Sequence, residues 1–279
     1  MSQLPIQLNS GIPADISLLY PVGWWRFGDG AGDTNSSGAS PANGDTVGTI
    51  VDQGSGGNDA TQTTTSLKPT FSTIVPAFNT YSVAFDGTND YVSTALDIGG
   101  SSALTVSAWV KHDDLTHPND DPNLLNQYAG LGTARAFRFS MYAKVDLWAG
   151  LLCSLYTTDG SAPVKDANYH LNPIISTGTW YHAAFVFDGT SLKVYYNGDN
   201  SQSSATTTWS TPTTLNNAGV QVLIGGGVGV GKYINGNIDE VGIWTSALSA
   251  SDIAAIYNCG VPTDISSYSP VGWWRMGDN

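Results

Sequence analysis

The chain is poor in charged side chains, and glutamate is almost absent from it. Asp, Glu, Lys and Arg together make up 12% of the 279 residues, and Glu240 is the sole glutamate. The ten Lys and Arg residues are spread singly, whereas proteins that bind nucleic acid cluster basic side chains to replace the counterions of phosphates. Together with a formal net charge of −13, this scarcity predicts no binding to nucleic acid and no attraction to anionic membranes.

Long apolar runs are also missing. No stretch is apolar enough to span a bilayer, and the opening "MSQLPIQLNS" has no basic segment followed by an apolar one, so we expect no signal peptide. The two cysteines, Cys153 and Cys259, lie far apart in the sequence and form no metal-binding spacing. One disulfide between them would be compatible with the sequence, but free thiols inside a large core are the favoured interpretation.

The chain is rich instead in Gly, Ser, Thr and Asn, which suit strands and turns better than helices. Residues 30–68 are crowded with these types and are expected to form loops. From about residue 80 onward, short segments alternate apolar and polar residues. In "ALTVSAWVK" this pattern would place Leu104, Val106 and Ala108 on one face of a strand. The segment at 179–199 predicts a hairpin that turns at Asp188-Gly189.

One segment, "LSASDIAAIYNCG", predicts a short helix. Ser249 suits the N-cap and Asp252 the third position of a capping box, while Gly260 would end the helix. His182 lies in a predicted strand, where we expect it to make a structural hydrogen bond. Many short strands with one short C-terminal helix predict an all-β fold, a two-sheet antiparallel jelly-roll sandwich.

The chain repeats part of itself. Residues 258–279 match residues 9–30 at fourteen of twenty-two positions, and both copies contain "PVGWWR". The spacing predicts a leading segment at 1–11, a module at 12–258 and a tail at 259–279. The tail is either the start of a further repeat or a strand that pairs with a sheet edge of its own or a neighbouring chain. Such a strand would use Val271, Trp273, Trp274 and Met276.

Four segments carry a family resemblance: "YSVAFDGTNDYV" (81–92), "LTVSAWVK" (104–111), "GTWYHAAFVFDGTSLKVYYNG" (178–198) and "GNIDEVGIWTSALSASDIAAIYN" (236–258). In this order they resemble the laminin-G-like jelly-roll domains of the concanavalin A-like lectin/glucanase superfamily. The resemblance implies the concanavalin A-like sandwich, which serves lectins, adhesion modules, hydrolases and structural domains alike. The "PVGWWR" junction resembles, more loosely, module boundaries in tandem-repeat virion proteins of marine phages, which implies a place on a virion surface.

The resemblance also provides a criterion for catalysis. Glucanases of this superfamily carry two glutamates on one strand, and glycoside hydrolysis needs two carboxyl groups about 5–10 Å apart. With Glu240 alone this pattern is absent, and the pairs Asp113-Asp114 and Asp120-Asp121 are interpreted as solvated loop residues. We therefore expect a protein that is not an enzyme.

A structural calcium ion is the one cofactor that the resemblance implies. In related domains it lies between a glycine-rich loop and the strand that carries the "IDE" triplet. In this chain those two segments supply Asp52, Asn58 and Asp239. Carboxylate and amide oxygens are the ligands that Ca²⁺ prefers.

Glycan binding would require aromatic rings exposed near strand ends, and the candidates are Trp148, Tyr156, Trp209 and Tyr233. The leading hypothesis is a binding or structural module on the surface of a viral particle, which recognises glycans or neighbouring subunits. A secreted bacterial adhesin or carbohydrate-binding module from a larger protein is the alternative. A glycoside hydrolase ranks third, because the chain has a single glutamate.

Overall fold

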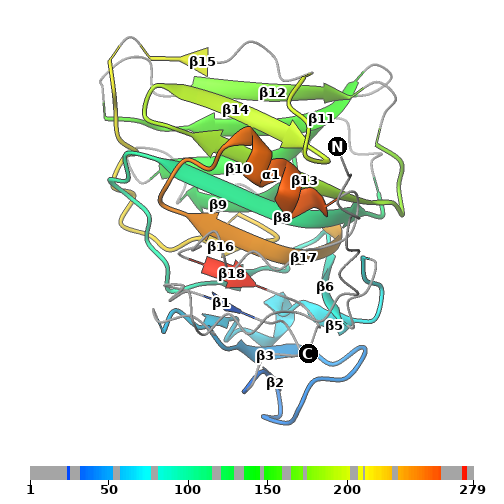
Figure 1. Ribbon diagram of the computed structural model, residues 1–279. Helices are drawn as coiled ribbons and strands as arrows, with labels where there is room; N and C mark the ends of the chain where they lie inside the picture. Colours follow the sequence, from blue (N-terminus) through cyan, green and yellow to red (C-terminus); the bar gives the residue numbers. More distant parts are fainter. Residues whose placement is uncertain are drawn as a thin grey trace, which may run out of the picture.

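The computed structural model describes residues 24–25, 32–52, 57–76, 81–114, 121–128, 135–144, 148–158, 165–171, 175–201, 207–209, 211–227, 232–258 and 272–274. They form two stacked β-sheets, a front sheet and a back sheet in the view of Figure 1, with one short α-helix over the front sheet. This arrangement confirms the predicted two-sheet jelly-roll sandwich with a short C-terminal helix. No helix within these ranges is long and apolar enough to cross a membrane.

The front sheet contains nine of the described strands. Seven lie side by side in the order β1 (Trp24–Trp25), β18 (Gly272–Trp274), β17 (Asn235–Trp244), β8 (Leu104–His112), β13 (Trp180–Phe187), β14 (Ser191–Tyr196) and β15 (Thr207–Thr208). The other two are β6 (Ser82–Asp86), which also pairs with β17, and β5 (Thr70–Ser72), which pairs with β6. All these pairs are antiparallel except β1 with β18, which is parallel.

The back sheet also contains nine described strands, all in antiparallel pairs. Their order is β12 (Lys165–Leu171), β11 (Trp148–Leu155), β10 (Arg135–Lys144), β9 (Asn123–Tyr128), β16 (Leu223–Ile224), β7 (Val92–Ser93), β4 (Ala60–Thr61), β3 (Val47–Ile50) and β2 (Thr34–Asn35). A 3₁₀ turn, Thr65–Leu67, lies between β4 and β5.

The core lies between the sheets and follows the predicted alternation of β8. Leu104, Val106 and Ala108 all point into it and are fully buried. From the back sheet, Phe139 of β10 packs edge-on against Phe185 of β13, with ring centroids 5.2 Å apart. Burying a side chain of this size contributes on the order of 2–3 kcal/mol. Cys153 of β11 is buried in the same core, and Cys259 lies outside the described residues.

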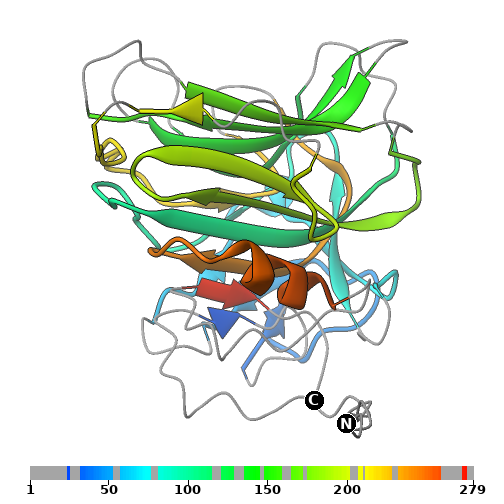
Figure 2. The ribbon, with the colours of Figure 1, turned by 45° about the horizontal axis from the view of Figure 1, so that its top comes forward.

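The helix α1 (Ala250–Tyr257) covers the opposite face of the front sheet (Figure 2), where Ile253 and Ile256 pack against the sheet. The predicted capping box is confirmed, because the Asp252 amide donates to Ser249 Oγ (3.2 Å) and the Ser249 amide to Asp252 Oδ2 (2.9 Å). The predicted stop at Gly260 is wrong. The helix ends at Tyr257, and Asn258 takes the left-handed cap conformation with φ 45°.

The predicted hairpin at Asp188-Gly189 joins β13 to β14. Gly189 has φ 88°, a conformation that costs glycine little. The Asp188 carboxylate accepts hydrogen bonds from the amides of Thr190 (2.8 Å) and Ser191 (2.6 Å). Partial burial alone would raise the pKa of Asp188, but the hydrogen bonds from Ser191 and Thr190 outweigh it and lower this pKa to about 2.

Two sequence-based predictions about this part of the fold are wrong. Residues 30–68, expected as loops, contain β2, β3 and β4, whose strands of two to four residues are too short to show an apolar period. The His182 side chain makes no hydrogen bond to any residue that the structure describes: its ring is fully buried beside Trp109, with centroids 5.7 Å apart, and neither ring nitrogen has a partner there. His112 is equally buried and stacks on Tyr181.

Candidate functional site on the back sheet

Polar side chains gather on the face of the back sheet that points away from the core. Along β10, Phe137 and Phe139 point into the core, so the intervening Arg138 points to the other face. The register places Arg138 opposite Asn126 of β9 and Ser154 of β11. Three neighbouring strands therefore contribute one polar row across this face.

A second pair lies one step along the same strands. Ser140 of β10 is the register partner of Asn123 of β9, after a shift between Phe139 and Ser140 that marks a β-bulge. Bulges aim side chains away from the regular alternation and are frequent near functional sites. The bulge brings Asn123 and Ser140 beside the row of Arg138 and Asn126.

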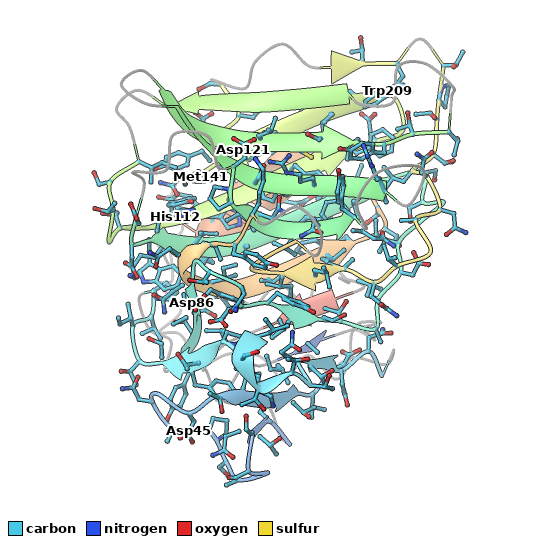
Figure 3. The ribbon with its side chains drawn as sticks, turned by 180° about the vertical axis from the view of Figure 1, so that it is seen from behind. Asp45, Asp86, His112, Asp121, Met141 and Trp209 are labelled. Carbon is cyan, nitrogen blue, oxygen red and sulfur yellow. The ribbon has the colours of Figure 1, made fainter. Side chains whose placement is uncertain are left out.

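Arg138 is held in place by contacts on two sides. Its Nε donates to Asn123 Oδ1 (2.8 Å), and its Nη2 donates to Asp121 Oδ2 (3.0 Å). Lys232 Nζ lies 3.5 Å from the same Asp121 oxygen. Figure 3 is seen from the side of this sheet, with Asp121 labelled in front of its strands. A guanidinium fixed by charge-assisted bonds presents its remaining edge in a set orientation.

Tyr233 adds an aromatic ring to this face. Its ring lies so close to Gly226 that a Cβ added to this glycine would stand 2.3 Å from Tyr233 Cδ1. The carbonyl of Gly226 accepts a hydrogen bond from Asn126 Nδ2 (2.5 Å). The absence of a side chain at residue 226 therefore lets the ring pack against the residue whose carbonyl bonds Asn126.

We name this group the back-sheet polar cluster; it consists of Asp121, Asn123, Asn126, Arg138, Ser140, Lys232 and Tyr233. The side chains of Arg138, Asp121 and Lys232 are 17%, 20% and 22% exposed, so they form a partly exposed rim. Asn123, Asn126 and Ser140 form a buried floor.

The floor contains polar atoms that have no hydrogen-bond partner among the residues that the structure describes. They are Asn123 Nδ2, Asn126 Oδ1 and Ser140 Oγ, a donor, an acceptor and a hydroxyl that can be either. Leaving a buried polar group unpaired costs about 1–3 kcal/mol, and each such group in a native protein needs an explanation. Three of them next to a fixed arginine favour a site for a ligand that carries both donors and acceptors.

The family of the chain follows from a comparison with known proteins. A family model described as the concanavalin A-like lectin/glucanases superfamily matches residues 86–254, which is more than half of the chain. The chain belongs to this superfamily. No curated protein sequence matches it.

Several solved structures are similar to this chain at low sequence identity. Domain 4 of AbnA, a GH43 extracellular arabinanase from Geobacillus stearothermophilus solved with arabinotriose, has 22% identity over 68% of this chain and 81% of its own, with a TM-score of 0.49. The binding domain of Paraclostridial Mosquitocidal Protein 1 has 17% identity over 75% of this chain and 49% of its own, with a TM-score of 0.55. The domain of bacteriophage CBA120 tailspike protein 2 that is described as enzymatically active has 12% identity over 75% of this chain and 32% of its own, with a TM-score of 0.55. The two matches with a TM-score of 0.55 show a shared fold.

Of the three predicted aromatic residues whose side chains the structure describes, Tyr233 lies at the polar cluster and is partly exposed. Trp209 was predicted wrongly: it is 5% exposed and packs edge-on against Phe187 inside the core. Trp148 begins β11, and its side chain lies outside the described part of the chain.

Tyr156 is not an exposed platform either. It is 6% exposed, and the Arg135 guanidinium lies 5.3 Å from its ring centroid. The same guanidinium lies 4.8 Å from the ring of Tyr128. Burial is the main cause that raises the pKa of Tyr156. The prediction overlooked that Arg135, the first residue of the neighbouring strand β10, would cover this ring.

The residues predicted to hold calcium sit on different sheets. Asp52 follows β3, and its Oδ2 accepts the amide of Asn58 (2.8 Å), while its own amide donates to Asp59 Oδ1 (2.9 Å). Asp239 lies in β17, fully buried, and its Oδ1 accepts a hydrogen bond from the amide of Glu240 (2.7 Å).

The carboxylate oxygens of Asp52 and Asp239 are of the kind that Ca²⁺ prefers as ligands. No cluster of three or more His, Cys, Asp or Glu side chains occurs among the residues that the structure describes, and calcium stays a prediction.

The aspartates considered for catalysis have other contacts. Asp113 forms an ion pair with Lys111, and Asp121 with Arg138. Asp120 lies outside the described residues. The sequence pattern missed the polar cluster because its members come from three separate segments, which only the fold brings together.

Proposed function

We propose that this chain is a non-catalytic binding module that takes a neutral glycan on the back-sheet polar cluster. The observation that carries the proposal is the set of unpaired polar atoms on Asn123, Asn126 and Ser140 beneath the rim of Arg138. Sugar hydroxyls both donate and accept hydrogen bonds, so one pyranose edge could satisfy a donor, an acceptor and a hydroxyl together.

The rim contributes the other features that a sugar needs. Tyr233 offers an apolar ring for the C–H face of a sugar, and Arg138 offers donors fixed by Asp121. The formal net charge of −13 repels anionic ligands at long range. A neutral glycan therefore suits the cluster better than a sulfated or sialylated one.

Membership of a superfamily that includes lectins supports a binding role, as does the similar fold of a toxin binding domain. The tailspike likeness also supports our proposal that the module belongs to a viral particle, where it attaches to host glycans or to neighbouring subunits. A secreted bacterial adhesin or carbohydrate-binding module is the second proposal. Hydrolysis has less support, since Glu240 is the sole glutamate and Asp121 is paired with Arg138.

The test is a glycan array probed with the labelled full chain, followed by calorimetry with the best neutral oligosaccharide. Arg138→Met should weaken binding at least about tenfold, because it removes the fixed donors. The matched control is Arg135→Met, on the same strand but outside the cluster, which should change affinity less than about threefold. Tyr233→Ala provides a second variant if Arg138→Met misfolds by circular dichroism. No binding to any neutral glycan, or equal losses for both arginines, would overturn the proposal.

A further inference from the structure

The repeated segment of this chain pairs with itself. β1 and β18 lie side by side in both ribbon views (Figures 1 and 2). They run parallel, with Trp24 opposite Trp273 and Trp25 opposite Trp274. The register partners are the corresponding residues of the two sequence copies. Each copy thus lies next to its own equivalent.

Among the described strands, the second copy, β18, pairs with the edge of β17, and the first copy, β1, pairs with β18. β18 pairs antiparallel with residues 241–243 of β17, with Gly272 opposite Ile243 and Trp274 opposite Val241. The preceding half of that edge, from Asn235 to Ile238, is occupied by β6. We name residues 241–243 the acceptor edge. It continues the line of β6, and Val241 and Ile243 behind it belong to the core.

The two copies are equivalent candidates for this edge. Both carry Pro-Val-Gly-Trp-Trp-Arg, and an added strand binds an edge mainly through main-chain hydrogen bonds. Identical sequences that form the same backbone ladder have similar binding free energies. β1, the copy outside β18, is therefore a spare strand with the sequence that the acceptor edge recognises.

We propose that the acceptor edge is a strand-exchange site, and that a second copy of this chain can supply its occupant through the repeated Pro-Val-Gly-Trp-Trp-Arg segment. A chain whose own copies leave the edge binds the spare copy of a neighbour. The exchange joins subunits without a new interface, as in domain swapping. This inference is independent of the glycan proposal, because it uses the front sheet and the backbone alone.

Proline substitutions in the full chain test the site, because proline lacks the N–H of a ladder and fits only edges. The readout is hydrogen exchange at the amides of residues 241–243. Trp24→Pro should leave their protection unchanged, since β18 stays in place. Trp273→Pro should reduce the protection of these amides less than about tenfold, because residues 23–25 then pair with the acceptor edge. The double variant, Trp24→Pro with Trp273→Pro, should lose about a hundredfold or more of this protection.

Mixing two chains tests whether a second copy can supply the strand that pairs with the acceptor edge. The double variant, with its edge open, should form a complex of about twice 29.3 kDa with the wild-type chain by light scattering. The Trp24→Pro chain, which has no spare copy, is the matched control and should form none. A peptide "PVGWWRMGDN" should restore protection, whereas "PVGPWRMGDN" should not.

Three results would overturn the inference. Protection could fall as far in Trp273→Pro as in the double variant, which would mean that the copies are not equivalent. Protection could survive in the double variant, which would mean that this segment does not hold the edge. The double variant could also stay monomeric with the wild-type chain. If the double variant does not fold, uptake of the fluorescent peptide by Trp273→Pro, in competition with residues 23–25, decides between exchange and none.

Discussion

The Nε of Arg138 donates a 2.8 Å hydrogen bond to Asn123 Oδ1. This contact fixes which end of the Asn123 amide faces the guanidinium, since Arg is a donor only. The Nδ2 end is thereby turned away and has no partner. Burying an unpaired donor costs free energy, which the rest of the fold or a bound ligand must offset.

Ser140→Ala should separate stability from binding. Ser140 Oγ is fully buried and unpaired, so its removal should raise the free energy of unfolding by about 1 kcal/mol in the absence of glycan. The same change should weaken glycan binding several-fold. Urea titration and calorimetry measure the two effects. A loss of stability would mean that the hydroxyl is satisfied in the native protein.

Phe139→Ala should be among the most destabilising single changes in the core. The ring is fully buried and meets Phe185 edge-on at 5.2 Å, and truncating such a residue costs about 3–5 kcal/mol. Ile74→Ala is the control, because Ile74 is 52% exposed and should cost less than about 0.5 kcal/mol. Similar midpoints in urea for the two variants would show that β10 does not pack as described.

The stability of the protein should fall as the pH falls from about 6.5 to 4. Desolvation by burial lowers the pKa of both His112 and His182 to about 3, whereas the unfolded chain takes up these protons near pH 6.5. Each histidine then reduces the free energy of unfolding by about 1.4 kcal/mol per pH unit in this window. Asp90 opposes the trend, because burial and then the nearby Asp86 raise its pKa to about 6.

The check is urea unfolding at several pH values, in which the free energy of unfolding should fall between pH 6 and 4. In this window the two histidines bind protons only in the unfolded chain, whereas Asp90 binds one proton only in the folded chain, so the histidines dominate. Asp90→Asn should steepen this loss, because it removes the opposing group. A stability that is constant or rises toward pH 4 would mean that the two imidazoles become protonated in the folded state.

Calcium should raise the melting temperature if the predicted site exists. Asp52 and Asp239 would be the principal ligands, so Asp239→Asn should abolish the increase while Asp45→Asn, whose carboxylate bonds Asn35, should retain it. The measurement is thermal unfolding with 5 mM CaCl₂ (a value on the order of extracellular-module affinities) against excess chelator. Equal melting temperatures for the wild-type chain in both conditions would remove calcium from the account.

The sequence contained enough to predict the sandwich, but not the site. The alternation of Leu104 and Val106 in β8 and the Ser249 capping box depend on local residue types, which one chain displays directly. The polar cluster depends instead on register: Arg138 meets Asn123 only because β9 and β10 pair with a bulge between them. Trp209 was misplaced because a tryptophan near a loop has the same local sequence whether it faces solvent or Phe187.

Nuclear magnetic resonance titration with the best neutral oligosaccharide tests the central claim most directly. If the back-sheet polar cluster binds the glycan, the largest amide shifts should fall in β9 and β10, around Asn123, Asn126 and Ser140, and the Asn123 side-chain amide should shift as its Nδ2 gains a partner. The front sheet and α1 should remain unchanged. Shifts confined to the front sheet, or none at saturating glycan, would contradict the account.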